Sequence, residues 1–255
     1  MPSDVSGAGP SQARQRPLPL FYNQVRPVDP AAHAGMALPD SPNFAFAAGT
    51  NTVPLNGQEF PFAQRNYPIV FARPPGSLVA LALLGLQRDV NLFVDRRTGR
   101  WAPYNYVPGY IRRYPFVFIE AQENRFALAV EQNYLVKGGK RQLFDQESKP
   151  TSLLQGALTF CGSYQKGYQE SQEFFAALLD ADLLVERQAD ASPTQGQKVR
   201  LSGFHVIDPQ RFRALSAATL VEWRDKGWLD WVYAHLFSQM NWRALAQRAD
   251  SAITL

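Results

Sequence analysis

The sequence has few of the residues that build disulfides and metal sites. Its single cysteine, Cys161, excludes an intramolecular disulfide and a cluster of thiolate ligands within one chain. The three histidines, His33, His205 and His235, do not share a zinc-site spacing such as H-x-x-x-H. We therefore predict no metal site and no cofactor, and we expect the histidines to be structural or to lie on the surface.

Long hydrophobic segments are also missing. The longest apolar run covers residues 78–86 and is too short to cross a bilayer. The first twenty residues contain no apolar core of the length that secretory signal peptides have. These features predict a cytoplasmic protein without a transmembrane segment. Export by a system that needs no signal peptide is the alternative.

Local motifs for catalysis and phosphate binding are absent as well. The sequence has no G-x-S-x-G nucleophile turn, and residues 137–140 (KGGK) lack P-loop spacing and predict a hairpin tip. Cys161 falls on the apolar face of a predicted helix, where a thiol packs as a small hydrophobe. An enzyme built on this sequence would have to assemble its site in the fold. Glu59, His205 or His235 beside an arginine are the candidate residues for such a site.

The composition is that of a globular protein with modest charge. Hydrophobic residues make up 45% and charged residues 19% of the chain. The net charge of +4 is well short of the dense basic stripe of a dedicated nucleic-acid binder. Nineteen prolines and seventeen glycines favour many short elements and turns over a helical bundle.

Composition also divides the chain into a tail and a folded part. Residues 1–19 are rich in Ser, Gly, Ala, Gln and Pro, which predicts a disordered tail. We expect residues 20–250 to form a single α+β domain. This domain is predicted to be β-rich over residues 44–148 and mainly helical over 151–250, with a hairpin near 183–207.

Short apolar runs between turn signals predict strands in the central part of the chain. A loop at residues 96–99 is predicted to be a hairpin connection in which Gly99 takes a positive φ. The short connections favour an antiparallel sheet or a small barrel, packed against helices from the C-terminal part. The predicted strands cover residues 43–48, 67–72, 78–84, 91–95, 114–120 and 125–131.

Helical periodicity replaces these runs after residue 150. Ser152 and Gln155 fit the capping box S-x-x-Q, followed by apolar residues at every third or fourth position. Asp-Pro and Ser signals predict the starts of two later helices. The predicted helices cover one turn at 58–64 and residues 152–179, 228–240 and 242–248, with two more beginning at Asp208 and Ser216.

Arginine and aromatic residues are concentrated just before residue 115. Guanidinium groups and aromatic rings can stack bases, hold carboxylates or anchor a protein partner. In the alternative, the rings wedge the sheet against the helices, the arginines stay solvated, and Asp89 or Asp95 pairs with some of them. We predict a binding surface here and name these residues the arginine–aromatic cluster: Arg96, Arg97, Arg100, Trp101, Tyr104, Tyr106, Tyr110, Arg112, Arg113 and Tyr114.

The last helices carry a second group of aromatic residues. Such density can mark an interface. The helical spacing of these residues favours core packing for most of them. The group consists of Trp223, Trp228, Trp231, Tyr233 and Trp242.

Five segments of the sequence resemble the bacterial SapC family. They are EFPFAQRNYPIVFA, LLGLQRDVNLFVD, GRWAPYNYVPGYIRRYPFVF, KPTSLLQGALTFCGSYQKGYQESQEFFAALLDADLL and the C-terminal part from GFHVIDPQ to ALAQR. The resemblance extends over residues 21–248. It implies an association with bacterial surface layers or with outer-membrane uptake systems, and it supplies no catalytic residues to carry over.

Together these features predict a non-catalytic accessory protein that docks a protein or a small acidic ligand through the arginine–aromatic cluster. An enzyme with a fold-assembled site is the alternative. A third possibility is a single-stranded nucleic-acid binder, which the small net charge disfavours and whose affinity would fall steeply with salt.

Overall fold

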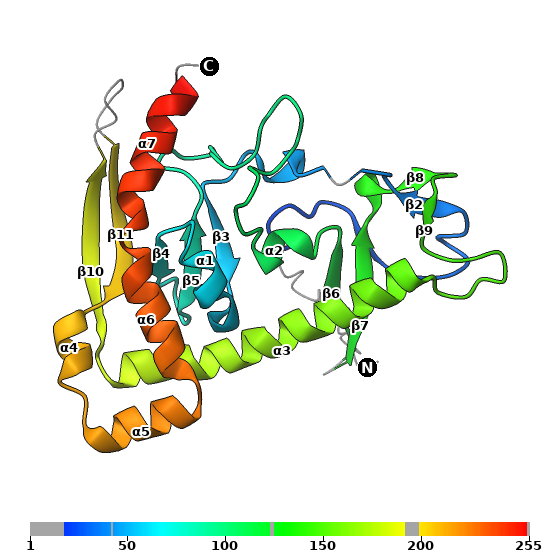
Figure 1. The fold of residues 1–255 in the computed structure, drawn as a ribbon. Coiled ribbons are helices and arrows are strands. Elements are labelled where there is room, and N and C mark those ends of the chain that lie inside the picture. The colour runs from blue at the N-terminus through cyan, green and yellow to red at the C-terminus, as the bar shows by residue number, and fades with distance from the viewer. Residues whose placement is uncertain (1–17, 42, 123–124, 192–198, 254–255) are drawn as a thin grey trace, which may run out of the picture.

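The computed structural model describes residues 18–41, 43–122, 125–191 and 199–253 (Figure 1). Except for its last two residues, the predicted tail at 1–19 lies outside these ranges. The fold is α+β, as predicted, with antiparallel sheets of five, three and three strands and helices that lie mostly in the C-terminal part. Among the described residues no sheet closes into a barrel.

The largest sheet forms the centre of the molecule. The predicted β4–β5 hairpin is confirmed, and the buried side chains of Ile69, Val70 and Phe71 place it in the main core. The predicted hairpin near residues 183–207 is confirmed as β10–β11. The strand order is β10-β11-β4-β5-β3, with β3 at Thr52–Leu55, β4 at Ile69–Ala72, β5 at Val79–Leu83, β10 at Leu184–Ala191 and β11 at Val199–Ile207.

Strands β4 and β11 of the central sheet diverge after a single paired position, and we call this opening the fork. Their described residues pair only at His205 and Phe71. Next to this pair, the Ile69 amide donates to Ser238 Oγ at 3.0 Å, and Gln239 Nε2 donates to the Ile69 carbonyl at 2.8 Å. The end of a C-terminal helix therefore satisfies the β4 backbone where β11 leaves it.

Two smaller sheets complete the β structure. The predicted strands at 114–120 and 125–131 are confirmed as an antiparallel pair, β6 and β7. The three-stranded sheets have the orders β1-β7-β6 and β8-β2-β9. Their strands are β1 at Val25–Pro27, β2 at Met36–Leu38, β6 at Phe116–Gln122, β7 at Arg125–Glu131, β8 at Val136–Lys137 and β9 at Arg141–Gln142.

The longest helix, α3, joins the two halves of the molecule (Figure 1). Its 29 residues pack Phe174 and Leu178 into the main core and Leu154 and Cys161 into a second core beneath β6 and β7. The helices are α1 at Phe60–Ala63, α2 at Gly109–Arg112, α3 at Ser152–Asp180, α4 at Pro209–Arg213, α5 at Ala217–Asp225, α6 at Trp228–Ser238 and α7 at Asn241–Ile253, with 3₁₀ turns at Ala45–Ala47, Gly57–Glu59 and Gln132–Tyr134. None of the described helices combines the length and apolarity that a membrane crossing needs.

The predicted N-caps of α4 and α5 are confirmed. Asp208 accepts from the Gln210 amide at 2.7 Å, and Ser216 accepts from the Thr219 amide at 3.1 Å. The predicted capping box of α3 is wrong. Thr151 is the N-cap of this helix, and its hydroxyl donates to the Gln142 carbonyl at 2.8 Å.

Two predicted strands are wrong for the same local reason. At residues 91–95 only Val94 forms a bridge, and the Asn91 side chain accepts from the Phe93 amide at 2.9 Å. At residues 43–48 the chain forms a 3₁₀ turn in which the Asn43 side chain accepts from the Ala45 amide at 2.7 Å. In both places an asparagine side chain takes a backbone amide that a strand would need.

Of the two predicted turns that contain glycine, one is confirmed and one is wrong. Gly99 has a φ of 66°, as predicted for the loop at 96–99. The predicted hairpin tip at residues 137–140 is wrong, because β8 and β9 lie on opposite sides of β2 and do not pair with each other.

Candidate functional site

The arginine–aromatic cluster is divided among several environments. Trp101 is 8% exposed and packs its ring 5.8 Å from Phe44 and 6.2 Å from Phe93. Tyr110 is also buried, and its hydroxyl donates to the Leu20 carbonyl at 3.4 Å. These two rings belong to the core and its edge.

Arg113 lies between rings of α2 and α3. Its guanidinium carbon is 4.0 Å from the Tyr110 ring, 4.8 Å from the Tyr164 ring and 5.8 Å from the Tyr22 ring. Cation–π contacts of this kind stabilise a partly buried guanidinium. Burial raises the pKa of the neighbouring Cys161 thiol to about 11, in keeping with its predicted role as a hydrophobe. Arg113 therefore holds α2 against α3.

Arg112 belongs to a row of contacting side chains on the surface beside α3. Its Nη2 donates to the Tyr106 hydroxyl at 3.0 Å, and its guanidinium carbon lies 5.0 Å from the Phe160 ring. The Tyr106 ring stacks on Phe62 with the centroids 5.8 Å apart. The Tyr106 hydroxyl donates in turn to Glu59 Oε1 at 2.9 Å.

Glu59 anchors the loop that carries Tyr106. The side chain is 6% exposed and accepts from the Gly109 amide at 2.6 Å and from the Asn56 amide at 3.1 Å. Burial raises the pKa of this carboxyl group, and the hydrogen bonds from Gly109, Asn56 and Tyr106 oppose the rise. A Cβ at residue 109 would lie 3.0 Å from Oε1, so the loop needs glycine to approach this closely. All polar atoms of the carboxylate serve the fold.

The remaining cluster residues lie apart from these. The Tyr114 ring stacks on Phe46 at 3.9 Å. Arg96, Arg97, Arg100 and Tyr104 are exposed, with Tyr104 at 103% relative exposure and a φ of 61°. These four residues form the exposed part of the cluster, and its role in binding stays a prediction.

The candidate residues for catalysis have local packing roles where the structure describes their contacts. The His235 ring is fully buried 5.1 Å from the Phe71 ring, and burial lowers its pKa to about 3. His205 lies opposite Phe71 in the sheet. Among the described residues, no group of three or more His, Cys, Asp and Glu side chains is arranged to hold a metal ion.

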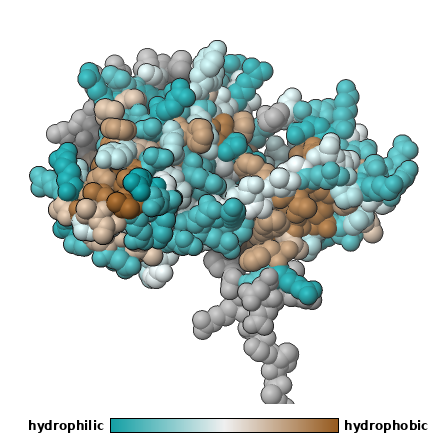
Figure 2. Space-filling view, turned by 60° about the horizontal axis from the view of Figure 1, so that its bottom comes forward, coloured by the Kyte–Doolittle hydropathy of each residue, from teal (hydrophilic) through white to brown (hydrophobic). Residues whose placement is uncertain are grey.

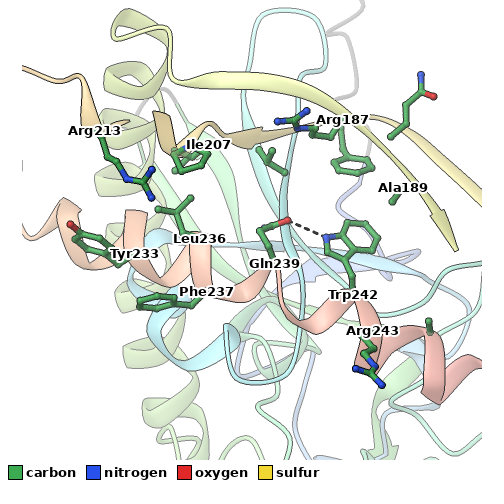
Figure 3. A pocket seen from close by; sticks show the side chains of 15 residues that line it. Arg187, Ala189, Ile207, Arg213, Tyr233, Leu236, Phe237, Gln239, Trp242 and Arg243 are labelled. Carbon is green, nitrogen blue, oxygen red and sulfur yellow. Dashed lines mark hydrogen bonds between the residues drawn. The ribbon is translucent and has the colours of Figure 1, made fainter. Parts of the chain in front are cut away.

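A different part of the molecule contains a groove of about 830 Å³ (Figure 3). It lies between the β10–β11 hairpin on one side and α6 and α7 on the other, next to the fork in the central sheet. Its volume is in the range of ligand-binding clefts. Its apolar lining consists mainly of Phe204, Val206, Ile207, Leu236, Phe237 and Trp242.

The groove is held in shape by the contacts at the fork. Gln239 donates to the Ile69 carbonyl through Nε2. Its Oε1 accepts from Trp242 Nε1 at 3.1 Å (Figure 3). The Trp242 ring in turn lies 5.4 Å from the Phe204 ring of β11. The wall formed by Trp242 is thus positioned before any ligand arrives.

Three arginines surround the apolar lining. Arg187 comes from β10, Arg213 from the end of α4 and Arg243 from α7, and all three are exposed. Among the described residues that line the groove there is no Asp or Glu. Within the described part of the chain, none of the three arginines forms an ion pair. Figure 3 shows Arg213 at the Tyr233 end and Arg187 and Arg243 toward the Trp242 end.

The groove continues onto an open stripe of α6. The Tyr233 and Phe237 rings stack 6.3 Å apart at 47% and 54% exposure, and Met240 is 75% exposed. Core packing is the predicted role of most of the late aromatic residues. That prediction is confirmed for the buried Trp223 and Trp228.

The spacing of two aromatic residues in the sequence points to the groove. Tyr233 and Phe237 are four residues apart and share a helix face, while Val232 and His235 of the same helix are buried. The face in Figure 2 shows hydrophobic residues in separate areas between hydrophilic ones.

Comparison with known proteins identifies the family. No curated protein and no solved structure shows significant similarity to this chain. The family model of SapC matches residues 28–245, which is nearly the whole chain. The chain therefore belongs to the SapC family.

Proposed function

We propose that this chain is a non-catalytic docking protein of a bacterial envelope, surface-layer or uptake system, and that it binds a partner protein in the groove. Membership of the SapC family supports the setting. The lining of the groove supports binding over catalysis, because it consists of aliphatic, aromatic, amide and guanidinium side chains. Glu59, His205 and His235 are not among its residues.

The observation that carries the proposal is the combination of an apolar groove with exposed rings and unpaired arginines. Tyr, Trp, Phe, Met and Arg are the residues most enriched where proteins bind each other. Tyr233 and Phe237 of α6 line the groove and stay about half exposed, and Met240, just past the end of α6, is also exposed. A small ligand buries most of its own surface in its site. The open stripe therefore favours a macromolecular partner.

Affinity capture from the native lysate with three forms of the protein tests this proposal. The forms are the wild type, a groove variant with Tyr233→Ala and Phe237→Ala, and a matched control with Arg96→Ala, Arg97→Ala and Arg100→Ala. We expect the control to retain a stoichiometric partner that the groove variant loses. In the complex, amide exchange of α6 and α7 slows.

The exposed part of the arginine–aromatic cluster is the second candidate surface. Tyr104 presents its whole side chain to solvent, and such a ring can insert into a partner. If the control with Arg96→Ala, Arg97→Ala and Arg100→Ala loses the partner and the groove variant retains it, docking is at the exposed part of the cluster. Retention by both variants contradicts both surfaces.

The proposal keeps two further expectations of the sequence analysis. We propose that residues 20–250 fold as a single domain and that the protein is cytoplasmic. Limited proteolysis that releases a stable fragment from within 20–250 would contradict the first. Recovery of the native protein in the envelope fraction, resistant to salt extraction, would contradict the second.

A further inference from the structure

We infer that the groove receives a short apolar peptide segment with acidic residues at both ends. This inference rests on the proposed function and names the chemistry of the partner. Its starting point is the distribution of charge around the groove. Arg213 lies at one end, Arg187 and Arg243 lie toward the other, and apolar side chains lie between them (Figure 3).

The positive charge of the arginines indicates that the partner segment is acidic. A segment that covers the groove removes water from the guanidinium groups, which is costly unless carboxylates replace that water. Among the residues that the structure describes, the groove lining supplies no carboxylate. Asp208 lies close enough to Arg187 to interact with its charge but forms no ion pair with it in the described part of the chain, and Asp208 Oδ1 accepts from the amides of Gln210 and Arg211. A guanidinium fork binds a carboxylate through two parallel hydrogen bonds, so an acidic partner satisfies these groups.

The length of the groove, from Tyr233 beside Arg213 to Arg243, sets the length of the segment. Residues 233 and 243 are ten positions apart on α6 and α7, which follow one another in Figure 1. At a rise of about 1.5 Å per residue, this corresponds to about 15 Å. An extended peptide spans that distance with about five residues. A segment of five apolar residues therefore has the length of the apolar part of the groove. A pair of acidic residues on each side of it reaches the arginines at the two ends.

Other occupants fit these features less well. The N-terminal residues 1–17 carry Arg14 and Arg16 against one acidic residue, Asp4, so their net charge has the same sign as that of the groove. An amphiphile with one acidic head group satisfies the arginines at one end only. A second copy of this chain would have to offer a segment of the stated pattern, and the oligomeric state tests that case.

The test uses fluorescein-labelled peptides and the full chain, with binding followed by anisotropy. The probe is Glu-Asp-Leu-Ile-Phe-Leu-Val-Asp-Glu. The first control peptide has lysine at all four acidic positions, and the second has all four acidic residues at one end. We expect the probe to bind about tenfold more tightly than the one-ended peptide, and the lysine peptide not to bind. Added salt weakens binding of the probe.

Variants of the protein locate the effect. Arg213→Gln and Arg243→Gln are each expected to weaken binding of the probe about tenfold, while Arg97→Gln, on the distant loop, leaves it unchanged. Arg213→Glu is expected to restore binding to a probe with lysines at one end only. This charge exchange distinguishes a specific contact from a general loss of positive charge.

The outcomes separate the inference from the proposed function. If all peptides bind equally and the Tyr233→Ala, Phe237→Ala variant loses them all, the groove docks proteins but the acidic-ended pattern is wrong. If no peptide binds, the acidic-ended pattern is wrong, and affinity capture with the groove variant still decides the proposed function. If this variant binds the peptides as the wild type does, the groove is not the binding site and both are wrong. A dimer in sedimentation that the groove variant dissolves makes a second copy the occupant and overturns the inference.

Discussion

Arg113 and Arg213 are both arginines that lie near tyrosine rings, and the structure gives them different surroundings. Arg113 stacks between Tyr110 and Tyr164 where α3 passes α2. Arg213 lies at the rim of the groove, exposed and without an ion pair in the described part of the chain. The same residue types thus serve packing in one region and present a surface in the other. The neighbouring elements, rather than the residue types, decide which use prevails.

The largest effect expected is in the packed region. Trp101→Ala removes a buried ring between Phe44 and Phe93 and is expected to lower the free energy of unfolding by about 3–5 kcal/mol, measured by urea denaturation. Tyr104→Ala, at an exposed ring, is the matched control and is expected to change it by about 0.5 kcal/mol or less. If Trp101→Ala changes the free energy of unfolding only slightly but abolishes partner binding, Trp101 belongs to a binding surface, as the sequence predicts, and not to the core.

The buried carboxyl group of Glu59 gives the next largest effect. Glu59→Gln places an amide where the carboxylate accepts from Asn56, Gly109 and Tyr106, and is expected to cost about 1–3 kcal/mol. Burial raises the pKa of Glu59 in the folded state, so the native protein binds more protons than the unfolded chain above the usual carboxyl range. The stability contribution of Glu59 is therefore lost as the pH rises through that window. Urea denaturation at several pH values should show this dependence in the wild type and not in the variant.

His235 sharpens the comparison within one helix, because it lies on the core face of α6 and Phe237 lies on the groove face. Burial lowers the pKa of His235 to about 3, below its usual value near 6.5. The unfolded chain binds a proton that the native protein does not, so stability falls by about 1.4 kcal/mol per pH unit as the pH drops below 6.5. His235→Phe removes this titrating group and is expected to reduce the slope by about 1.4 kcal/mol per pH unit, which corresponds to one proton. An unchanged slope would show that another group titrates.

The two arginine environments can be compared directly. Arg113→Ala removes contacts with Tyr110 and Tyr164 and is expected to cost about 1 kcal/mol. Arg97→Ala, at an exposed position, is the control. Equal effects of the two substitutions on urea denaturation would contradict the packing role of Arg113.

The smallest effect on stability is expected at the groove. Arg213→Gln should change the free energy of unfolding by about 0.5 kcal/mol or less, because the side chain is exposed and unpaired in the described part of the chain. A large loss of stability would mean that Arg213 supports the fold, and the groove would then resemble the packed region around α2.

Much of the fold could be predicted from short stretches of sequence. The β4–β5, β6–β7 and β10–β11 pairs and the caps at Asp208 and Ser216 depend on residues close together in the chain. The strand predicted at 91–95 failed because the Asn91 side chain binds the Phe93 amide and the Ala47 carbonyl. The apolar pattern of that segment does not predict which backbone groups the Asn91 side chain hydrogen-bonds.

The sequence by itself determined the family, the α+β class and most of the local elements, because hydrophobic period, turn residues and caps act over a few positions. Only the tertiary structure decided how the arginines and aromatic rings are used. Ser238 and Gln239 reach Ile69 across about 170 residues of chain and open the fork beside which the groove lies. Arg113 likewise meets Tyr164 only because α3 passes beneath α2. Side chains with the same chemistry become core or surface according to which distant element covers them, and that depends on packing of the whole chain.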